Sequence, residues 1–223
     1  MNKEIRHGLV AALLLVSAGA QAAMSATELA LVQADAWRVR MGFHLLSIRG
    51  DNPEDRAALK ALLADGEQHL DALKAQAAPG EKDTAAQLEA SWDALDQRAL
   101  DNPLASLGYA DYSAMSEINT TTLAVDALVR KAEVAGDATY LDIAQLSVAM
   151  QRLASEYAAL AAFPSAGLKT GTGLQSMDFG AEARAIDESL VSLKDKYAGD
   201  EQASDVLAFI DQRWAFVRKS IPG

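Results

Sequence analysis

The sequence predicts an all-α protein, an antiparallel helical bundle with two pseudo-repeated helical units. Half of its 223 residues are hydrophobic, yet runs of β-branched residues are short. Apolar residues recur at steps of three and four, and the few glycine and proline residues lie between these periodic segments. This combination is typical of amphipathic helices packed around a shared core.

The repeat consists of residues 31–48 and 143–160, which superpose at an offset of 112. Gln33 and Arg40 of the first copy recur as Gln145 and Arg152. Each copy contains one seam at helical spacing. The seam residues are Leu31, Ala34, Arg38, Met41, Leu45 and Ile48 in the first copy, and Ile143, Leu146, Met150, Leu153, Tyr157 and Leu160 in the second.

The first element, residues 1–22, has the pattern of a secretory signal peptide. Lys3 and Arg6 precede an apolar run that ends in Ala20-Gln21-Ala22, a small-residue cleavage pattern. We therefore expect an exported protein of the periplasm that begins near Ala23. The apolar run is too short to span a bilayer, so we expect no transmembrane helix after cleavage.

Residues 25–100 form the first expected unit, and helix-start signals divide it. Ser25 and Glu28 make a capping box, and Asn52-Pro53 makes an N-cap followed by proline at the first helical position. A break at residues 78–80 ends the second helix. The expected helices are residues 25–49, 53–76 and 83–100.

A connector, residues 101–136, carries one more helix at about 113–133. The second unit, residues 137–220, repeats the scheme with helices at about 138–163, 179–197 and 200–220. Trp92 and Trp214 lie near the ends of the two units. We expect the whole of residues 23–223 to be one helical-bundle domain.

The composition argues against several classes of protein. The signal segment carries two basic residues and one acidic residue, so the 20 basic and 31 acidic residues of the chain become 18 and 30. This acidic balance disfavours nucleic acid as a partner. The chain has no cysteine, which excludes disulfides and covalently attached haem.

Metal, cofactor and enzyme signatures are absent from the sequence as well. His44 and His69 have no second histidine at chelating spacing, so we expect no metal site. No nucleophile elbow or phosphate-binding loop occurs, and we expect neither a cofactor nor an enzyme.

Arg38 is the first candidate functional residue, because it interrupts an apolar seam. A guanidinium keeps its proton in a protein and therefore needs an anionic partner when it is buried. Asp35, one turn earlier, is one candidate partner. The alternative is that Arg38 and Arg40 hold a small planar anion through their forked donors.

A polar stripe on the same helix supplies the other candidates. Gln33, Trp37, Arg40 and His44 follow one another at helical spacing. Aromatic and arginine side chains together suit a ligand site or an interface. The stripe is also compatible with a solvated face on which Trp37 covers a neighbouring helix.

Two short segments indicate a family. Arg38-Val39-Arg40-Met41, with Gln151-Arg152-Leu153 at the matching place in the second copy, resembles the motif of the PilJ-type N-terminal domain of type IV pili methyl-accepting chemotaxis transducers. That family is similar to the periplasmic helical domains of nitrate/nitrite sensors. The resemblance implies a helical sensor domain in which Arg38, Arg40 and, more weakly, Arg152 contact an anion.

Two hypotheses follow. In the first, the protein is an exported, sensor-like bundle that binds a small ligand, such as nitrate or nitrite, without an output module of its own. Its site would consist of Arg38, Arg40, Arg152, Trp37 and His44. The protein would act as a homodimer or with a membrane receptor as its partner. In the second, the bundle is a periplasmic protein-protein interaction module in which Arg38 is structural.

Overall fold

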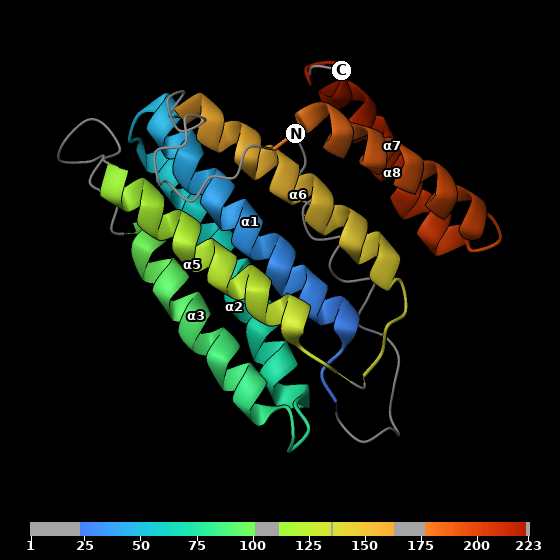
Figure 1. Ribbon diagram of the computed structural model, residues 1–223, viewed down its shortest axis with the longest axis horizontal. Coiled ribbons are helices and arrows are strands. Elements are labelled where there is room, and N and C mark those ends of the chain that lie inside the picture. The colour runs from blue at the N-terminus through green and yellow to red at the C-terminus, as the bar shows by residue number, and fades with distance from the viewer. Residues whose placement is uncertain (1–22, 101–111, 135, 163–176, 222–223) are drawn as a thin grey trace.

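The computed structural model describes residues 23–100, 112–134, 136–162 and 177–221, and this part of the chain is helical without strands. It confirms the all-α class and the bundle-like packing. Figure 1 shows that helices adjacent in sequence run antiparallel. The helices are α1 (Ala26–Arg49), α2 (Pro53–Gln76), α3 (Lys82–Leu100), α5 (Tyr112–Lys131), α6 (Leu141–Ala162), α7 (Phe179–Lys196) and α8 (Glu201–Arg218). The predicted signal segment lies outside the described residues.

The helix starts of the first unit follow the capping residues. The Ser25 hydroxyl accepts a hydrogen bond from the backbone N–H of Glu28 at 3.3 Å, and Asn52 caps α2 through the N–H of Asp55 at 2.9 Å. Helix α6 begins three residues later than its predicted start. Tyr140, immediately before it, has a φ of 58°, a left-handed conformation that an α-helix does not contain.

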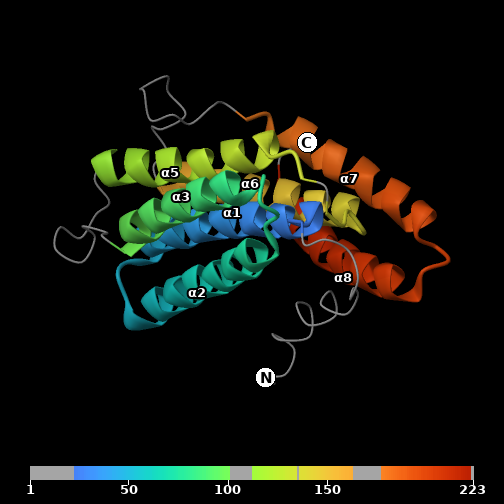
Figure 2. The same cartoon turned by 90° about the horizontal axis from the view of Figure 1, so that it is seen from below.

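The described residues pack into two hydrophobic cores. The first joins α1, α2, α3 and α5, and its largest fully buried side chains include Phe43, Leu73 and Ile118. The second joins α6, α7 and α8 around residues such as Leu190 and Leu207. Helix α5, which we expected in the connector, therefore belongs to the first core, where it packs against α3 and α1. Figure 2 shows it lying along α3.

Helices α1 and α6, which carry the two copies of the repeat, lie side by side and run parallel (Figure 1). The Ser25 hydroxyl donates to the carbonyl of Asp137 at 2.9 Å, and the Thr27 hydroxyl donates to that of Thr139 at 2.7 Å. Both pairs are 112 residues apart, which is also the offset of the repeat. The two copies thus meet in register. This parallel pair is an exception to the antiparallel arrangement.

A close backbone approach permits this register. A Cβ atom on Gly136 would lie 2.2 Å from the carbonyl oxygen of Met24. Any larger residue would therefore push the chain before α6 away from the start of α1.

The two tryptophans at the ends of the units have different surroundings. Trp92 of α3 packs over Gly66 of α2, where a Cβ atom would come within 2.1 Å of the indole ring. Trp214 of α8 donates from Nε1 to Asp187 of α7 at 2.6 Å. Both side chains are buried, and each connects the last two helices of its unit, Trp92 between α2 and α3 and Trp214 between α7 and α8.

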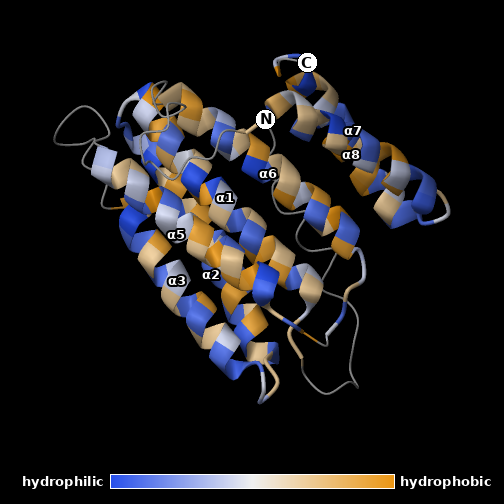
Figure 3. Cartoon of the chain, in the orientation of Figure 1, coloured by the Kyte–Doolittle hydropathy of each residue, from blue (hydrophilic) through white to orange (hydrophobic). Residues whose placement is uncertain are grey.

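Hydrophobic and hydrophilic residues alternate in bands along the helices (Figure 3). No helix of the described ranges is both long and apolar enough to cross a membrane.

Candidate functional site

The polar stripe of α1 is buried. Gln33 is 8% exposed, Trp37 and His44 are 1% exposed, and Arg40 is 0% exposed. The interpretation of this stripe as a solvated face is therefore wrong. Its side chains meet α5 and α6, and we call the group the Arg40 cluster: Gln33, Trp37, Arg40 and His44 of α1, Asp126 of α5, and Ser155 and Glu156 of α6.

Arg40 is the centre of this cluster. Its Nη1 donates to the Ser155 hydroxyl at 3.0 Å, and its Nη2 donates to Glu156 Oε2 at 3.1 Å. Its guanidinium also lies 5.4 Å from the centre of the Trp37 ring, within range of a cation–π interaction. Burial lowers the pKa of Arg40, and the charge and hydrogen bond of Glu156 oppose that shift. Arg40 stays charged because guanidinium does not deprotonate in proteins.

Asp126 holds the other end of the stripe. Its Oδ1 accepts from Gln33 Nε2 at 2.7 Å and from Trp37 Nε1 at 3.1 Å. Its Oδ2 pairs with Arg130, one turn later on α5. These bonds fix the amide of Gln33 and the indole of Trp37, so the wall of the cluster beside Arg40 is rigid.

Two groups in the cluster have polar atoms without hydrogen-bond partners. They are Nε of Arg40 and both ring nitrogens of His44, all buried. Burial, together with the positive charge of Arg40, lowers the pKa of His44 to about 3, so its imidazole is neutral at neutral pH. Buried polar atoms are nearly always hydrogen-bonded in folded proteins. Among the described residues, Oε2 of Glu28 is the other buried side-chain atom without a partner, so three of these four atoms lie in the Arg40 cluster.

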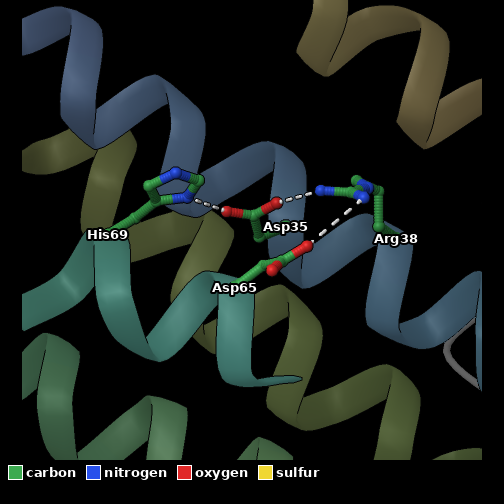
Figure 4. A network of polar contacts seen from close by, with 4 residues as sticks. All are labelled: Asp35, Arg38, Asp65 and His69. Atoms are coloured by element: carbon green, nitrogen blue, oxygen red, sulfur yellow. Dashed lines mark hydrogen bonds and ion pairs between the residues drawn. The ribbon is translucent and has the colours of Figure 1, made fainter. Parts of the chain in front are cut away.

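Arg38 lies on a different face of α1, towards α2 (Figure 4). Its Nη1 donates to Asp35 Oδ1 at 2.7 Å, and its Nη2 lies 4.0 Å from Asp65 Oδ2. The Arg38 side chain is 34% exposed. The internal Asp35–Arg38 pair, one of the two alternatives for this arginine, is therefore present.

Asp35 also joins His69 of α2, whose Nδ1 lies 2.6 Å from Asp35 Oδ2 (Figure 4). The pKa of His69 is raised, first by this hydrogen bond and then by the charges of Asp35 and Asp65, against the effects of burial and of Arg38. Because the charged imidazole binds the buried carboxylate, the network links α1 to α2 most strongly when His69 is protonated.

This network gives a pH-dependent contribution to stability. A histidine whose pKa is raised on folding stabilises the protein fully below its unfolded pKa of about 6.5, and this stability is lost as the pH rises through the folded value. We expect His69→Gln to remove a fall in the free energy of unfolding above about pH 6.5. Urea titrations at several pH values would measure it, and an equal fall in both proteins would contradict the assignment.

The structure separates the predicted site residues into groups. Trp37, Arg40 and His44 come together in the Arg40 cluster, whereas Arg38 belongs to the network with Asp35. Arg152 lies half-buried on α6 and, among the described residues, makes none of the contacts of either group. The three arginines therefore do not form one site within a single chain.

The sequence does not reveal which residues of the other helices join the cluster. Asp126 interrupts the apolar face of α5, next to Val125 and one turn after Thr122, and this irregularity was the available signal. Glu156 is the copy-two counterpart of His44, but only the parallel register of α1 and α6 places it beside Arg40. No signal within a single helix indicates that pairing.

No group of three or more histidine, cysteine, aspartate or glutamate side chains that could hold a metal ion occurs in the described part of the chain. The Arg40 cluster offers a charged donor, the Arg40 guanidinium, and a neutral imidazole, His44, whose nitrogens are unpartnered. Its chemistry suits the binding of a hydrogen-bond acceptor.

Comparison with models of protein families finds no match. Comparisons with curated proteins and with solved structures find no match either. The resemblance to PilJ-type domains therefore rests on the short sequence motif.

Proposed function

We propose that this protein is an exported, sensor-like helical bundle that binds a small anion, with nitrate and nitrite as the first candidates, through α1. The site is the Arg40 cluster rather than Arg38. One observation carries the proposal: Nε of Arg40 and both nitrogens of His44 are buried without hydrogen-bond partners. An acceptor placed between them would receive bonds that nothing in the described chain supplies.

The chemistry of the donors selects the class of ligand. The Nε–H of a guanidinium is a charged donor of fixed direction, and charge-assisted hydrogen bonds to anions are about twice as strong as neutral ones. Arg40 and His44 are four residues apart on one helix, which places their Cβ atoms about 5–6 Å from each other. Such a spacing suits an anion of a few atoms.

The position of Glu156 supports a route to the cluster. Its side chain is 13% exposed, while Arg40 is fully buried. We therefore place the entry of a small solute beside Glu156.

The interaction-module hypothesis has its own support in the repeated seam of α1. Leu31, Met41 and Leu45 of this seam are only partly buried, and Ile48 is 46% exposed. By contrast, the other apolar residues of α1 at helical spacing are buried in the first core. They are Leu29, Val32, Ala36, Val39, Phe43 and Leu46. A partner helix laid along the exposed seam would bury it and would leave Arg38 in a structural role.

Thermal unfolding with nitrate distinguishes the two functions. At a hundred times its dissociation constant, a ligand of the folded state adds about 2.7 kcal/mol, which for a chain of this size raises the midpoint by roughly 5–10 °C. We expect this rise for the wild-type protein in millimolar nitrate, relative to chloride at equal ionic strength.

Two variants locate the site. Arg40→Lys keeps the positive charge beside Glu156 but lacks Nε–H, so it should lose the nitrate response. Arg38→Ala should keep the response. The opposite outcome would move the site to Arg38, and no response in the wild-type protein would reject anion binding in favour of the interaction module.

A further inference from the structure

The charges of the Arg40 cluster are already balanced. Arg40 is paired with Glu156 at 3.1 Å, and Asp126 is paired with Arg130. His44 is neutral at neutral pH because its pKa is about 3. The cluster together with Arg130 therefore carries no net charge before a ligand binds.

An anion bound beside Arg40 would leave this buried cluster with a net negative charge, which a low-dielectric interior strongly disfavours. Two responses restore the balance. A nearby group takes up a proton, or Glu156 leaves Arg40 and moves its charge into water.

We propose that a small anion enters the Arg40 cluster together with one proton, which His44 takes up. This inference rests on the proposed function and adds its regulation. The proton comes from the solvent, and the only bond formed is the second N–H bond of the imidazole. With both ring nitrogens protonated, His44 becomes a charged donor that can face the anion.

The surroundings of His44 favour it as the proton acceptor. The charged groups bound within the cluster are Arg40 on α1, Glu156 on α6, and Asp126 with its partner Arg130 on α5. Of these, Arg40 is the one whose charge acts on His44. Both carboxylates are engaged in ion pairs. His44 is the member of the cluster with two unpartnered nitrogens, so protonation adds a donor without breaking any contact.

The same surroundings explain why the proton arrives only with the anion. Burial and the charge of Arg40 both lower the pKa of His44 in the unliganded protein. An anion next to the guanidinium offsets the positive charge of Arg40 and pairs with the protonated imidazole of His44. Both interactions raise the pKa of His44. By reciprocity, a lower pH strengthens anion binding.

Titration calorimetry with nitrate, which stays an anion throughout the relevant range, measures this coupling. Binding enthalpies in two buffers with different ionisation enthalpies give the number of protons taken up. At about pH 5 we expect nearly one proton per nitrate, and the affinity should fall by as much as tenfold for each unit rise in pH.

Glu156→Gln is the matched variant. It keeps the shape of the side chain but leaves Arg40 with an uncompensated charge, so nitrate itself restores the balance. We expect tighter nitrate binding in this variant, with proton uptake close to zero and little dependence on pH.

Two contrary outcomes are distinguishable. Nitrate binding by the wild-type protein without proton uptake would mean that Glu156 is displaced into solvent, and would overturn this inference while leaving the proposed function intact. If neither protein binds nitrate at any pH, the proposed function fails and the inference fails with it.

Discussion

Replacing Arg40 with alanine is expected to lower the free energy of unfolding by about 3–5 kcal/mol, the typical cost of removing one partner from a buried ion pair. The change removes the bonds to Ser155 and Glu156 and uncovers the Trp37 ring. It also leaves a largely buried carboxylate on α6 without its cation. Urea unfolding with linear extrapolation gives the value directly.

Arg38→Ala is the control for this prediction, because the two arginines are separated by one residue of the same helix. The Arg38 side chain is 34% exposed, and Asp35 keeps His69 as a partner when Arg38 is absent. An exposed ion pair contributes about 0–1 kcal/mol. A cost for Arg38→Ala equal to that of Arg40→Ala would contradict the different burial of the two residues.

A double variant tests whether the pair itself stabilises the fold. Buried ion pairs replaced by apolar residues of similar volume are often neutral or stabilising. We therefore expect Arg40→Met combined with Glu156→Leu to recover most of the stability lost in Arg40→Ala. Such recovery would indicate that the pair is kept for binding or for register rather than for stability.

The helices could be predicted from the sequence because their signals are local. Ser25 and Asn52 cap the helices that follow them, and Pro53 lies at a first helical position. These interactions involve residues three or four positions apart, so the sequence alone contains both partners. The repeat offset of 112 was also visible, although its consequence, a parallel α1–α6 pair in register, needed the structure.

Only the part of the site that lies on one helix could be predicted, because only that part has local signals. The stripe from Gln33 to His44 lies on one helix, and its spacing places these residues on one face. Which face is buried depends on α5 and α6, more than 80 residues away. Arg38 interrupts the apolar seam that begins at Leu31, but this seam is only partly covered and Arg38 stays partly exposed. The fully buried arginine of α1 is Arg40.

The second large expected effect is an increase in stability. Replacing His44 with leucine is expected to raise the free energy of unfolding by about 1–3 kcal/mol, the usual cost of leaving buried polar atoms unsatisfied. His44 is 1% exposed, and its ring meets Phe43 edge-on with centroids 5.5 Å apart. An apolar side chain would keep such packing and remove two unpartnered nitrogens.

We also expect His44→Leu to change how the free energy of unfolding depends on pH below neutrality. A histidine with a pKa lowered to about 3 in the folded state makes the protein less stable as the pH falls below its unfolded value of about 6.5, because the unfolded chain takes up the proton first. In His44→Leu this contribution to acid destabilisation should disappear. Urea titrations between about pH 4 and pH 7 would show it as a shallower slope.

His44→Gln is the polar control, because glutamine retains a donor and an acceptor but does not titrate. It should lose the acid dependence without gaining the stability of the leucine variant. A stabilised His44→Leu protein that no longer responds to nitrate would mean that stability is given up at this position for binding, as functional sites commonly require. If His44→Leu were instead strongly destabilised, the imidazole would have a structural role, and the ligand site would lose its main support.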